Sequence, residues 1–307
     1  MKKDLISIDD LSKPVLDHYL ALAARVEALP PEKKRALLPG RVLATLFYEP
    51  STRTRLSFES SMCRLGGSAI GFSQAAATSV AKGETLRDTA RTVERYADVM
   101  VIRHPNEGAA RIVAEAVKVP VINAGDGANQ HPSQTLLDLY TIQKYFGGIQ
   151  PGLRIALVGD LKYSRTIHSL VQALAWFEGV EFLLVSPPLL RLPGYIMETG
   201  AASKVRFEES EDLTWAIKCC DVLYMTRIQK ERFPDVLEYE KVKDAYVLTR
   251  AHLEDAPPKL KVLHPLPRVN EIASDVDDTP HAAYFDQVGN GIVVRQAVLL
   301  DLLEVKP

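Results

Sequence analysis

The strongest constraint on the fold of this chain is an alternation of short apolar runs with longer amphipathic stretches. The apolar runs are nearly continuous in valine, isoleucine and leucine, as expected for parallel strands buried on both faces. They predict strands at residues 42–48, 98–104, 120–126, 154–160, 180–186, 221–227 and 261–264. Apolar residues at helical spacing predict helices between them, at residues 84–97, 107–117, 134–146 and 165–176. This alternation is typical of α/β proteins with parallel sheets.

A cluster of structure-breaking residues between Phe146 and Gly152 predicts a domain boundary. The length of 307 residues suits two domains, because a domain usually has roughly 100–200 residues. The predicted fold class is therefore α/β, with two doubly wound parallel-sheet domains and the ligand site in the cleft between them. We place the domains at residues 1–148 and 149–289, and we expect the helix at about 290–307 to pack back on the first domain.

Charge and composition exclude several kinds of partner. Lys and Arg number 37 against 39 Asp and Glu, so no global field recruits nucleic acid. No apolar run approaches the ~18 residues needed to span a bilayer, and aspartates interrupt the first twelve residues, where a signal peptide needs an apolar core. The cysteines Cys63, Cys219 and Cys220 are too few and too poorly spaced for a disulfide framework or a zinc site. We predict a cytoplasmic protein with no membrane or nucleic-acid partner.

Ligands of such sheets bind where strands lead into helices. After the first predicted strand come Ser51, Thr52, Arg53, Thr54 and Arg55, followed by a helical stretch. Hydroxyl groups, free backbone N–H groups and the positive end of a helix dipole suit an oxyanion, and the planar arginine head groups suit phosphate oxygens. The alternative is a well-capped helix with solvated arginines. The phosphate loop GxxxxGK[ST] does not occur in the sequence.

The third predicted strand leads into a glycine-rich turn that ends at His131 and Gln134. These two residues lie three positions apart near a helix start, so both side chains can face one ligand. A structural or solvated histidine is an equally good interpretation of His131 alone. A metal site is not expected, because no second histidine or carboxylate stands at ligand spacing.

In the second half of the chain, Arg165 and Arg227 each follow a predicted strand. They predict a second anion site that faces the first, although surface salt bridges are the commoner fate of a single arginine. A later strand ends at His264 and is followed by two prolines, whose lack of N–H groups leaves carbonyl oxygens available to a ligand amine. One domain thus offers a phosphate site and the other a carboxylate site, as in a transferase that acts on two anions.

Taken together, these motifs resemble the aspartate/ornithine carbamoyltransferase family over essentially the whole chain. The residues that carry the resemblance are 47–55, 82–84, 101–104, 130–134, 226–232 and 264–268. His264-Pro265-Leu266-Pro267 stands where the ornithine branch typically has His-Cys-Leu-Pro, and that branch lacks the run at 227–232. The resemblance therefore implies transfer of the carbamoyl group of carbamoyl phosphate to the α-amine of L-aspartate, an early step of pyrimidine biosynthesis.

The resemblance also implies roles by position. Carbamoyl phosphate would be bound by Ser51, Thr52, Arg53, Thr54, Ser79, Lys82, Arg103, His131, Gln134 and the Leu266 carbonyl. Within that set Thr54, Arg103 and His131 would polarise the carbonyl group, and Gln134 and Leu266 would hold the carbamoyl NH2. The aspartate would be bound by Lys82, Arg165, Arg227, Gln229 and Pro267. The residues expected to take part in catalysis are Arg53, Thr54, Lys82, Arg103, His131 and Gln134.

The resemblance further implies a homotrimer in which active sites are shared between subunits. Ser79 and Lys82 would enter the site from the adjacent subunit, and Thr78 is an alternative to Ser79. A separate regulatory chain is compatible with this assembly. No cofactor or metal is implied, and the Leu266–Pro267 bond is expected to be cis.

Features of the sequence count against three alternative functions. A carbamoyltransferase for a basic amine such as ornithine would need acidic residues where Arg165, Arg227 and Gln229 stand. A binding protein for phosphorylated metabolites would have no use for His131 and Gln134. A nicotinamide oxidoreductase fits the strand–helix alternation but lacks its glycine fingerprint.

Overall fold

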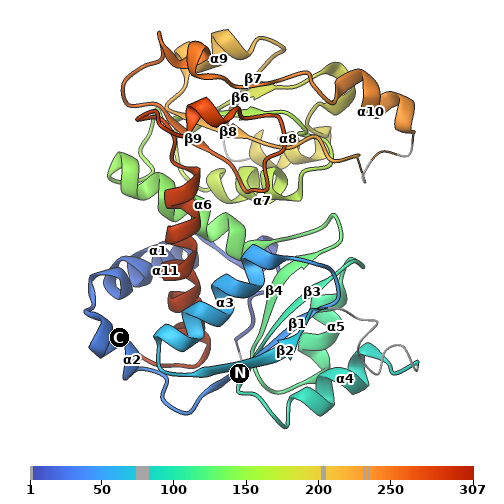
Figure 1. Ribbon diagram of the computed structural model, residues 1–307, viewed down its shortest axis with the longest axis vertical. Helices are drawn as coiled ribbons and strands as arrows, with labels where there is room; N and C mark the ends of the chain where they lie inside the picture. The colour runs from blue at the N-terminus through green and yellow to red at the C-terminus, as the bar shows by residue number, and fades with distance from the viewer. Residues whose placement is uncertain (1–2, 74–82, 202–204, 231–232, 234) are drawn as a thin grey trace. The chain divides into compact units, whose positions relative to one another are not determined.

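The computed structural model describes residues 3–73, 83–201, 205–230, 233 and 235–307. The chain divides into two compact units, of which unit 1 comprises Met1–Tyr140 with Gly289–Pro307 and unit 2 comprises Thr141–Val288. Each unit has one sheet, and every strand pair in it is parallel. The predicted α/β class with two parallel-sheet domains is confirmed (Figure 1).

The sheet of unit 1 has the strand order β2-β1-β3-β4. Its strands are β1 (Val42–Phe47), β2 (Ser68–Phe72), β3 (Val99–His104) and β4 (Val121–Asp126). The helices in unit 1 are α1 (Lys13–Ala28), α2 (Pro31–Arg35), α3 (Thr52–Arg64), α4 (Leu86–Val93) and α5 (Ala109–Ala116). Most of α6 (Pro132–Phe146) and of α11 (Tyr284–Leu302) also belongs to unit 1, and the limits between the units fall within these two helices.

Helices cover both faces of this sheet. Ala44 and Leu46 of β1 lie in a buried cluster with residues of α4 and α5. Thr45, which points to the other face because side chains alternate along a strand, donates a hydrogen bond to Glu59 of α3 at 3.0 Å. The outer side of β4 is covered by the N-terminal segment, where Leu5 exchanges backbone hydrogen bonds with Val121 and Asn123. This arrangement is doubly wound, as predicted.

The sheet of unit 2 has the strand order β7-β6-β5-β8-β9. Its strands are β5 (Arg154–Val158), β6 (Glu181–Val185), β7 (Arg206–Ser210), β8 (Val222–Met225) and β9 (Lys261–Leu263). Its helices include α7 (Arg165–Leu174), α8 (Gly194–Ala201), α9 (Leu213–Cys219) and α10 (Val236–Val242). Figure 1 shows α9 on one side of these strands and α7 on the other.

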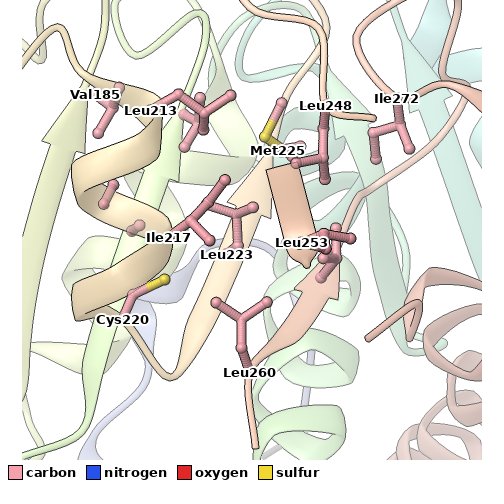
Figure 2. Packing of buried hydrophobic residues seen from close by; sticks show 14 of the residues in the cluster. Val185, Leu213, Ile217, Cys220, Leu223, Met225, Leu248, Leu253, Leu260 and Ile272 are labelled. Atoms are coloured by element: carbon pink, nitrogen blue, oxygen red, sulfur yellow. The ribbon is translucent and has the colours of Figure 1, made fainter. Parts of the chain in front are cut away.

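A cluster of buried apolar residues fixes α9 on this sheet. Leu213 and Ile217 of α9 pack with Val185, Leu223 and Met225 of the strands (Figure 2). Replacing one such buried leucine or isoleucine by alanine lowers the free energy of unfolding by about 2–5 kcal/mol in other proteins. The cluster therefore fixes the carboxyl ends of β6 and β8 against α9, and the loops that follow these strands start from there.

In both sheets the order in which strands are added reverses beside the first strand. In unit 1 the chain adds β2 on one side of β1 and then β3 on the other, and in unit 2 it adds β6 and β7 on one side of β5 and then β8 on the other. Loops that leave the carboxyl ends of the two strands at such a switch point run to opposite faces, which opens a crevice for ligands. The topology thus marks the ends of β1 and β3, and of β5 and β8, as candidate binding positions.

The sequence prediction missed β2 and β7, which are two of the four outer strands in the described sheets. Both have mostly exposed or half-buried residues, in contrast to the buried central strands. None of the helices in the described part of the chain has the length and apolar character needed to cross a membrane.

Candidate active site

The first candidate position is the start of α3, directly after β1. Ser51 is the N-cap residue of α3, and its side chain makes no capping hydrogen bond to the helix. Thr54 is buried in the first turn, whereas Thr52 and Arg53 are exposed. The first-turn N–H groups and these side chains lie together at a helix N-terminus, which is a favourable position for an anion.

Arg55 has a different environment from Arg53. Its Nε lies 2.7 Å from Oε1 of Glu59, one turn further along α3. Thr45 of β1 donates to the same carboxylate oxygen. Arg55 therefore helps to attach α3 to the sheet.

Arg103 lies at the end of β3 and crosses the switch point of unit 1. Its guanidinium lies 2.9 Å from Oε2 of Glu49, which follows β1, and it donates to the Ala124 carbonyl of β4 at 3.2 Å. The side chain is only 13% exposed. These contacts hold a buried positive charge beside the start of α3, where it can reach an anion bound by that helix.

The loop after β4 is organised by the buried carboxylate of Asp126. It accepts hydrogen bonds from the backbone N–H groups of Gly108 and Gln130, at 2.8 and 3.1 Å. The side-chain amides of Asn123 and Asn129 also donate to it, at 2.8 and 3.1 Å. A carboxylate with four donors fixes the turn that carries the chain into α6.

His131 and Gln134 follow this turn, and both are buried. His131 Nδ1 lies 3.4 Å from the Ser133 hydroxyl, and Gln134 donates from Nε2 to Asp138 Oδ1 at 2.9 Å. In unit 1 the structure thus brings Ser51, Thr52, Arg53, Thr54, Arg103, His131 and Gln134 to the carboxyl end of one sheet.

The switch point of unit 2 is held through the backbone. Gly159 has a φ of +110°, and a Cβ atom there would lie 2.5 Å from the Thr226 carbonyl oxygen. The Thr226 hydroxyl donates to the Val158 carbonyl at 2.9 Å and accepts from the Asp160 N–H at 3.1 Å. Only glycine permits this close approach of the loops after β5 and β8.

Arg165 and Arg227 start from these loops. Arg165 is the first residue of α7, whose N-cap residue Ser164 makes no capping hydrogen bond to the helix. Arg227 and Gln229 follow β8, and all three side chains are half-buried. Two guanidinium groups at one switch point suit carboxylates, with which arginine forms paired hydrogen bonds.

The loop after β9 is shaped by a buried His264–Glu271 pair. His264 Nδ1 accepts from the Leu266 N–H at 2.7 Å, and its Nε2 lies 2.7 Å from Glu271 Oε1. Since Nδ1 is an acceptor, Nε2 carries the proton and donates to the carboxylate. Leu266 has a φ of +53°, and the Leu266–Pro267 bond is cis, as the sequence predicts.

Several functional contacts escaped the sequence analysis. Glu49, Asp126, Asp138 and Glu271 each hold a predicted site residue or the turn beside it. These carboxylates bind partners that lie in other elements, in the same loop or one helical turn away. The sequence contains no motif that singles out these contacts.

Part of the prediction cannot be placed. Ser79, Lys82 and the alternative Thr78 lie outside the described residues, as do Glu231 and Arg232 of the run at 227–232. In the described ranges, no group of three or more His, Cys, Asp or Glu side chains could hold a metal ion.

The geometry agrees with comparisons to known proteins. The carbamoyl-P binding domain of aspartate/ornithine carbamoyltransferase matches residues 3–144, and the Asp/Orn binding domain matches residues 151–302. The chain belongs to the aspartate/ornithine carbamoyltransferase family. Both family domains are therefore present in their order along the chain.

Relatives within the family cover the full length of this chain. The aspartate carbamoyltransferase catalytic subunit of Thermococcus onnurineus is 58% identical over 97% of this chain and 96% of its own length. That of Methanocaldococcus jannaschii is 55% identical over 98% of each. A solved structure of the M. jannaschii catalytic subunit matches with a TM-score of 0.92, covering 99% of this chain and 98% of that one. The Trypanosoma cruzi aspartate transcarbamoylase, solved with carbamoyl phosphate and aspartate, is 37% identical, with a TM-score of 0.89 and coverage of 97% and 96%.

Proposed function

We infer that this chain transfers the carbamoyl group of carbamoyl phosphate to the α-amino group of L-aspartate, giving N-carbamoyl-L-aspartate and phosphate. This reaction is an early step of pyrimidine biosynthesis. The observation that carries the inference is the identity of 53–58% over nearly the whole chain with relatives described as aspartate carbamoyltransferase catalytic subunits. The ornithine alternative is disfavoured, because Arg165 and Arg227 would repel a basic acceptor.

Carbamoyl phosphate is assigned to unit 1. Its phosphate is bound by Ser51, Thr52, Arg53 and Thr54 at the start of α3, and Arg103 bridges the phosphate and the carbonyl oxygen. The uncapped N-terminus of α3 and the buried guanidinium of Arg103 support this assignment. His131 polarises the carbonyl group, and Gln134 accepts a hydrogen bond from the carbamoyl NH2.

Aspartate is assigned to unit 2. Arg165, Arg227 and Gln229 bind its carboxylates, and Pro267 orients its amine, while the Leu266 carbonyl completes the acceptor set for the carbamoyl NH2. The support is the position of the arginines at the switch point and the rigid Leu266 turn on the His264–Glu271 pair. It stays a prediction that these groups and those of unit 1 share one cleft.

The chemistry follows from the charges of the two substrates. The deprotonated aspartate amine attacks the carbamoyl carbon, a C–N bond forms, and negative charge develops on the carbonyl oxygen. Donors from Thr54, Arg103 and His131 stabilise that charge, an effect often worth about 3 kcal/mol per donor. The C–O bond to phosphate then breaks, and the departing phosphate takes the amine proton. Much of the rate arises from holding two anions in line.

The assembly proposed from the sequence is a homotrimer. Ser79 and Lys82 would complete each site from the adjacent subunit, and Lys82 would contact both substrates. Exposed Leu56 and Ile70, on α3 and β2, provide apolar surface that a subunit contact would bury. A regulatory chain that links trimers is compatible with this proposal. The free cysteines Cys63, Cys219 and Cys220 support the predicted cytoplasmic location.

The deciding experiment is a paired assay with carbamoyl phosphate and either aspartate or ornithine. We expect carbamoyl aspartate and phosphate in equal amounts, with aspartate only. Turnover with ornithine would mean that the Arg165 and Arg227 region has been misinterpreted. Binding of carbamoyl phosphate without turnover of either amine would favour the binding-protein alternative.

Shared sites can be tested by mixing two inactive variants. Arg53→Ala chains lack the phosphate site, and Lys82→Ala chains lack the residue given to the neighbour. If sites are shared, dissociating and reassociating an equal mixture restores about a quarter of the native sites, each built from one intact Arg53 and one intact Lys82. No recovery of activity, or an active monomer in sedimentation, contradicts the shared trimer.

A further inference from the structure

Two buried residues of opposite charge lie behind the proposed carbamoyl site. Asp138 on α6 is 0% exposed, and Arg295 on α11 is 4% exposed. The two charges interact, although the side chains are 157 positions apart in sequence. Buried charges are costly unless they are paired, and neither residue has a role in the reaction as derived so far.

Arg295 lies where three helices of unit 1 meet. It donates to the Ser57 hydroxyl of α3 at 2.7 Å, and its guanidinium lies 5.0 Å from the centre of the Phe58 ring. Gly291, one turn earlier on α11, leaves room for it, because a Cβ atom there would lie 2.6 Å from the guanidinium. The position is therefore shaped around a guanidinium group.

Arg295 supplies a positive charge near Asp138. Burial lowers the pKa of the Arg295 guanidinium to about 10, and the Asp138 charge opposes this change. Arg295 therefore still carries its charge at neutral pH. A nearby cation favours the ionised form of a buried carboxylate.

An ionised carboxylate can only accept hydrogen bonds, and this decides how the Gln134 amide is oriented. A glutamine amide presents an NH2 donor on one side and an oxygen acceptor on the other. Since Asp138 Oδ1 accepts from Gln134 Nε2 at 2.9 Å, the NH2 group is turned to Asp138 and the amide oxygen is turned away from it. The reversed amide would place two acceptors against each other.

We propose that Asp138 is a positioning residue that determines specificity by presenting the Gln134 amide oxygen to the donor substrate. This inference rests on the proposed function and extends it. An oxygen at this place accepts a hydrogen bond from the NH2 of a carbamoyl group, but it has no partner in an acyl phosphate that carries a methyl group instead. The orientation of the Gln134 amide thus selects a carbamoyl over an acetyl donor.

The test compares carbamoyl phosphate with acetyl phosphate as donors to aspartate. Acetyl transfer forms the C–N bond of N-acetylaspartate and breaks the same C–O bond to phosphate. In Asp138→Asn the neutral side chain can accept or donate, so the Gln134 amide can take either orientation. We expect kcat/KM for carbamoyl phosphate to fall about tenfold, while that for acetyl phosphate changes by less than about twofold.

A control and a second variant separate positioning from folding. Ser61→Ala removes a hydroxyl that donates to the Ser57 carbonyl within α3 and to the Ile292 carbonyl of α11, without touching Asp138. It should lower the unfolding midpoint and leave the ratio between donors unchanged. If Asp138→Asn does not fold, Arg295→Gln removes the positive charge that acts near Asp138 and should lower the ratio in the same direction.

The outcomes are distinct. A native chain that forms no carbamoyl aspartate would overturn the proposed function. A native chain that prefers carbamoyl phosphate, with the full preference retained in both Asp138→Asn and Arg295→Gln, would overturn only the role of Asp138. Equal losses with both donors would likewise make Asp138 merely structural.

Discussion

The two units present their proposed binding groups at equivalent places in their sheets but hold them in different ways. In unit 1 the groups are side chains with charged neighbours: Arg103 lies against Glu49, and Gln134 against Asp138. In unit 2 the fixed part is the backbone, through the Thr226 hydroxyl and the His264 contact to the Leu266 N–H. Arg165 and Arg227 follow the loops after β5 and β8, which the Thr226 hydroxyl joins.

This difference suits the two ligands. A carbamoyl group has one oxygen and one NH2 at defined positions, so its recognition requires side chains of fixed orientation. Two carboxylates on a flexible amino acid require positive charges at the right separation, which rigid turns can provide. We therefore expect substitutions in unit 1 to lower turnover and those in unit 2 to weaken aspartate binding.

The largest effect is expected from Arg53→Ala and Arg103→Ala. Each removes a positive charge from the proposed carbamoyl phosphate site, so kcat/KM should fall about 10²–10³-fold. Arg55→Ala is the matched control on the same helix, because Arg55 is occupied by Glu59 at 2.7 Å. Steady-state kinetics should show a change below about threefold in the control. An equal loss in Arg55→Ala would show that the whole start of α3 was disturbed.

The next effect is expected from Arg165→Ala and Arg227→Ala in unit 2. The loss of one carboxylate contact should raise KM for aspartate about 10–100-fold and leave KM for carbamoyl phosphate within about threefold. Arg206→Ala is the control, since this arginine on β7 is 83% exposed and contacts Glu181 at the sheet edge. If carbamoyl phosphate binding weakened as much as aspartate binding, the division of labour between the units would be wrong.

The sequence predicts the buried strands well and misses the two exposed outer strands β2 and β7, for a physical reason. Strands such as β5 are buried on both faces and must be apolar throughout. β7 reads Arg-Phe-Glu-Glu-Ser and lies at the sheet edge, where half of its side chains meet solvent. β4 is also an outer strand, but the N-terminal segment around Leu5 covers it, and it is fully buried and was predicted.

The candidate site shows the same limit. The positions of Ser51 and Arg53 after β1, and of Arg103 near the end of β3, could be predicted because a strand end is visible in the sequence. The proposed role of Asp138 could not, because its hydrogen bond to the Gln134 amide and its burial in unit 1 become visible only in the fold. Contacts between residues far apart in the chain leave no local pattern from which to predict them.

A smaller effect is expected from Glu271→Gln, which alters the Leu266 turn without removing a binding group. Burial alone would raise the pKa of Glu271, but hydrogen bonds from His264 and from the Val269 N–H lower it below the usual value. Such a carboxylate stabilises the fold above its unfolded pKa, and this contribution is lost as the pH falls through the lower folded pKa. The urea midpoint of the native chain should therefore fall as the pH drops below about 4.5, and less steeply in Glu271→Gln.

The control for this prediction is Glu254→Gln, at an exposed position of the same unit. It should leave the pH dependence as in the native chain. Glu271→Gln should also lower turnover severalfold, since the neutral amide holds His264 less firmly beneath Leu266. Identical acid profiles for Glu271→Gln and the native chain would show that the buried pair does not stabilise this turn.

The smallest effect on activity is expected at Cys220, which belongs to the core that supports unit 2 (Figure 2). Burial raises the pKa of its thiol to about 12, so almost no reactive thiolate is present at neutral pH. In a chain with Cys63→Ala and Cys219→Ala, Cys220 is the only thiol, and we expect near-native activity and no alkylation by iodoacetamide. Alkylation should appear only at urea concentrations that open unit 2, where it reports the stability of that core separately from unit 1. Rapid alkylation in native buffer would mean that the core beneath β8 opens readily, and the rigid turns proposed for aspartate binding would then lack their support.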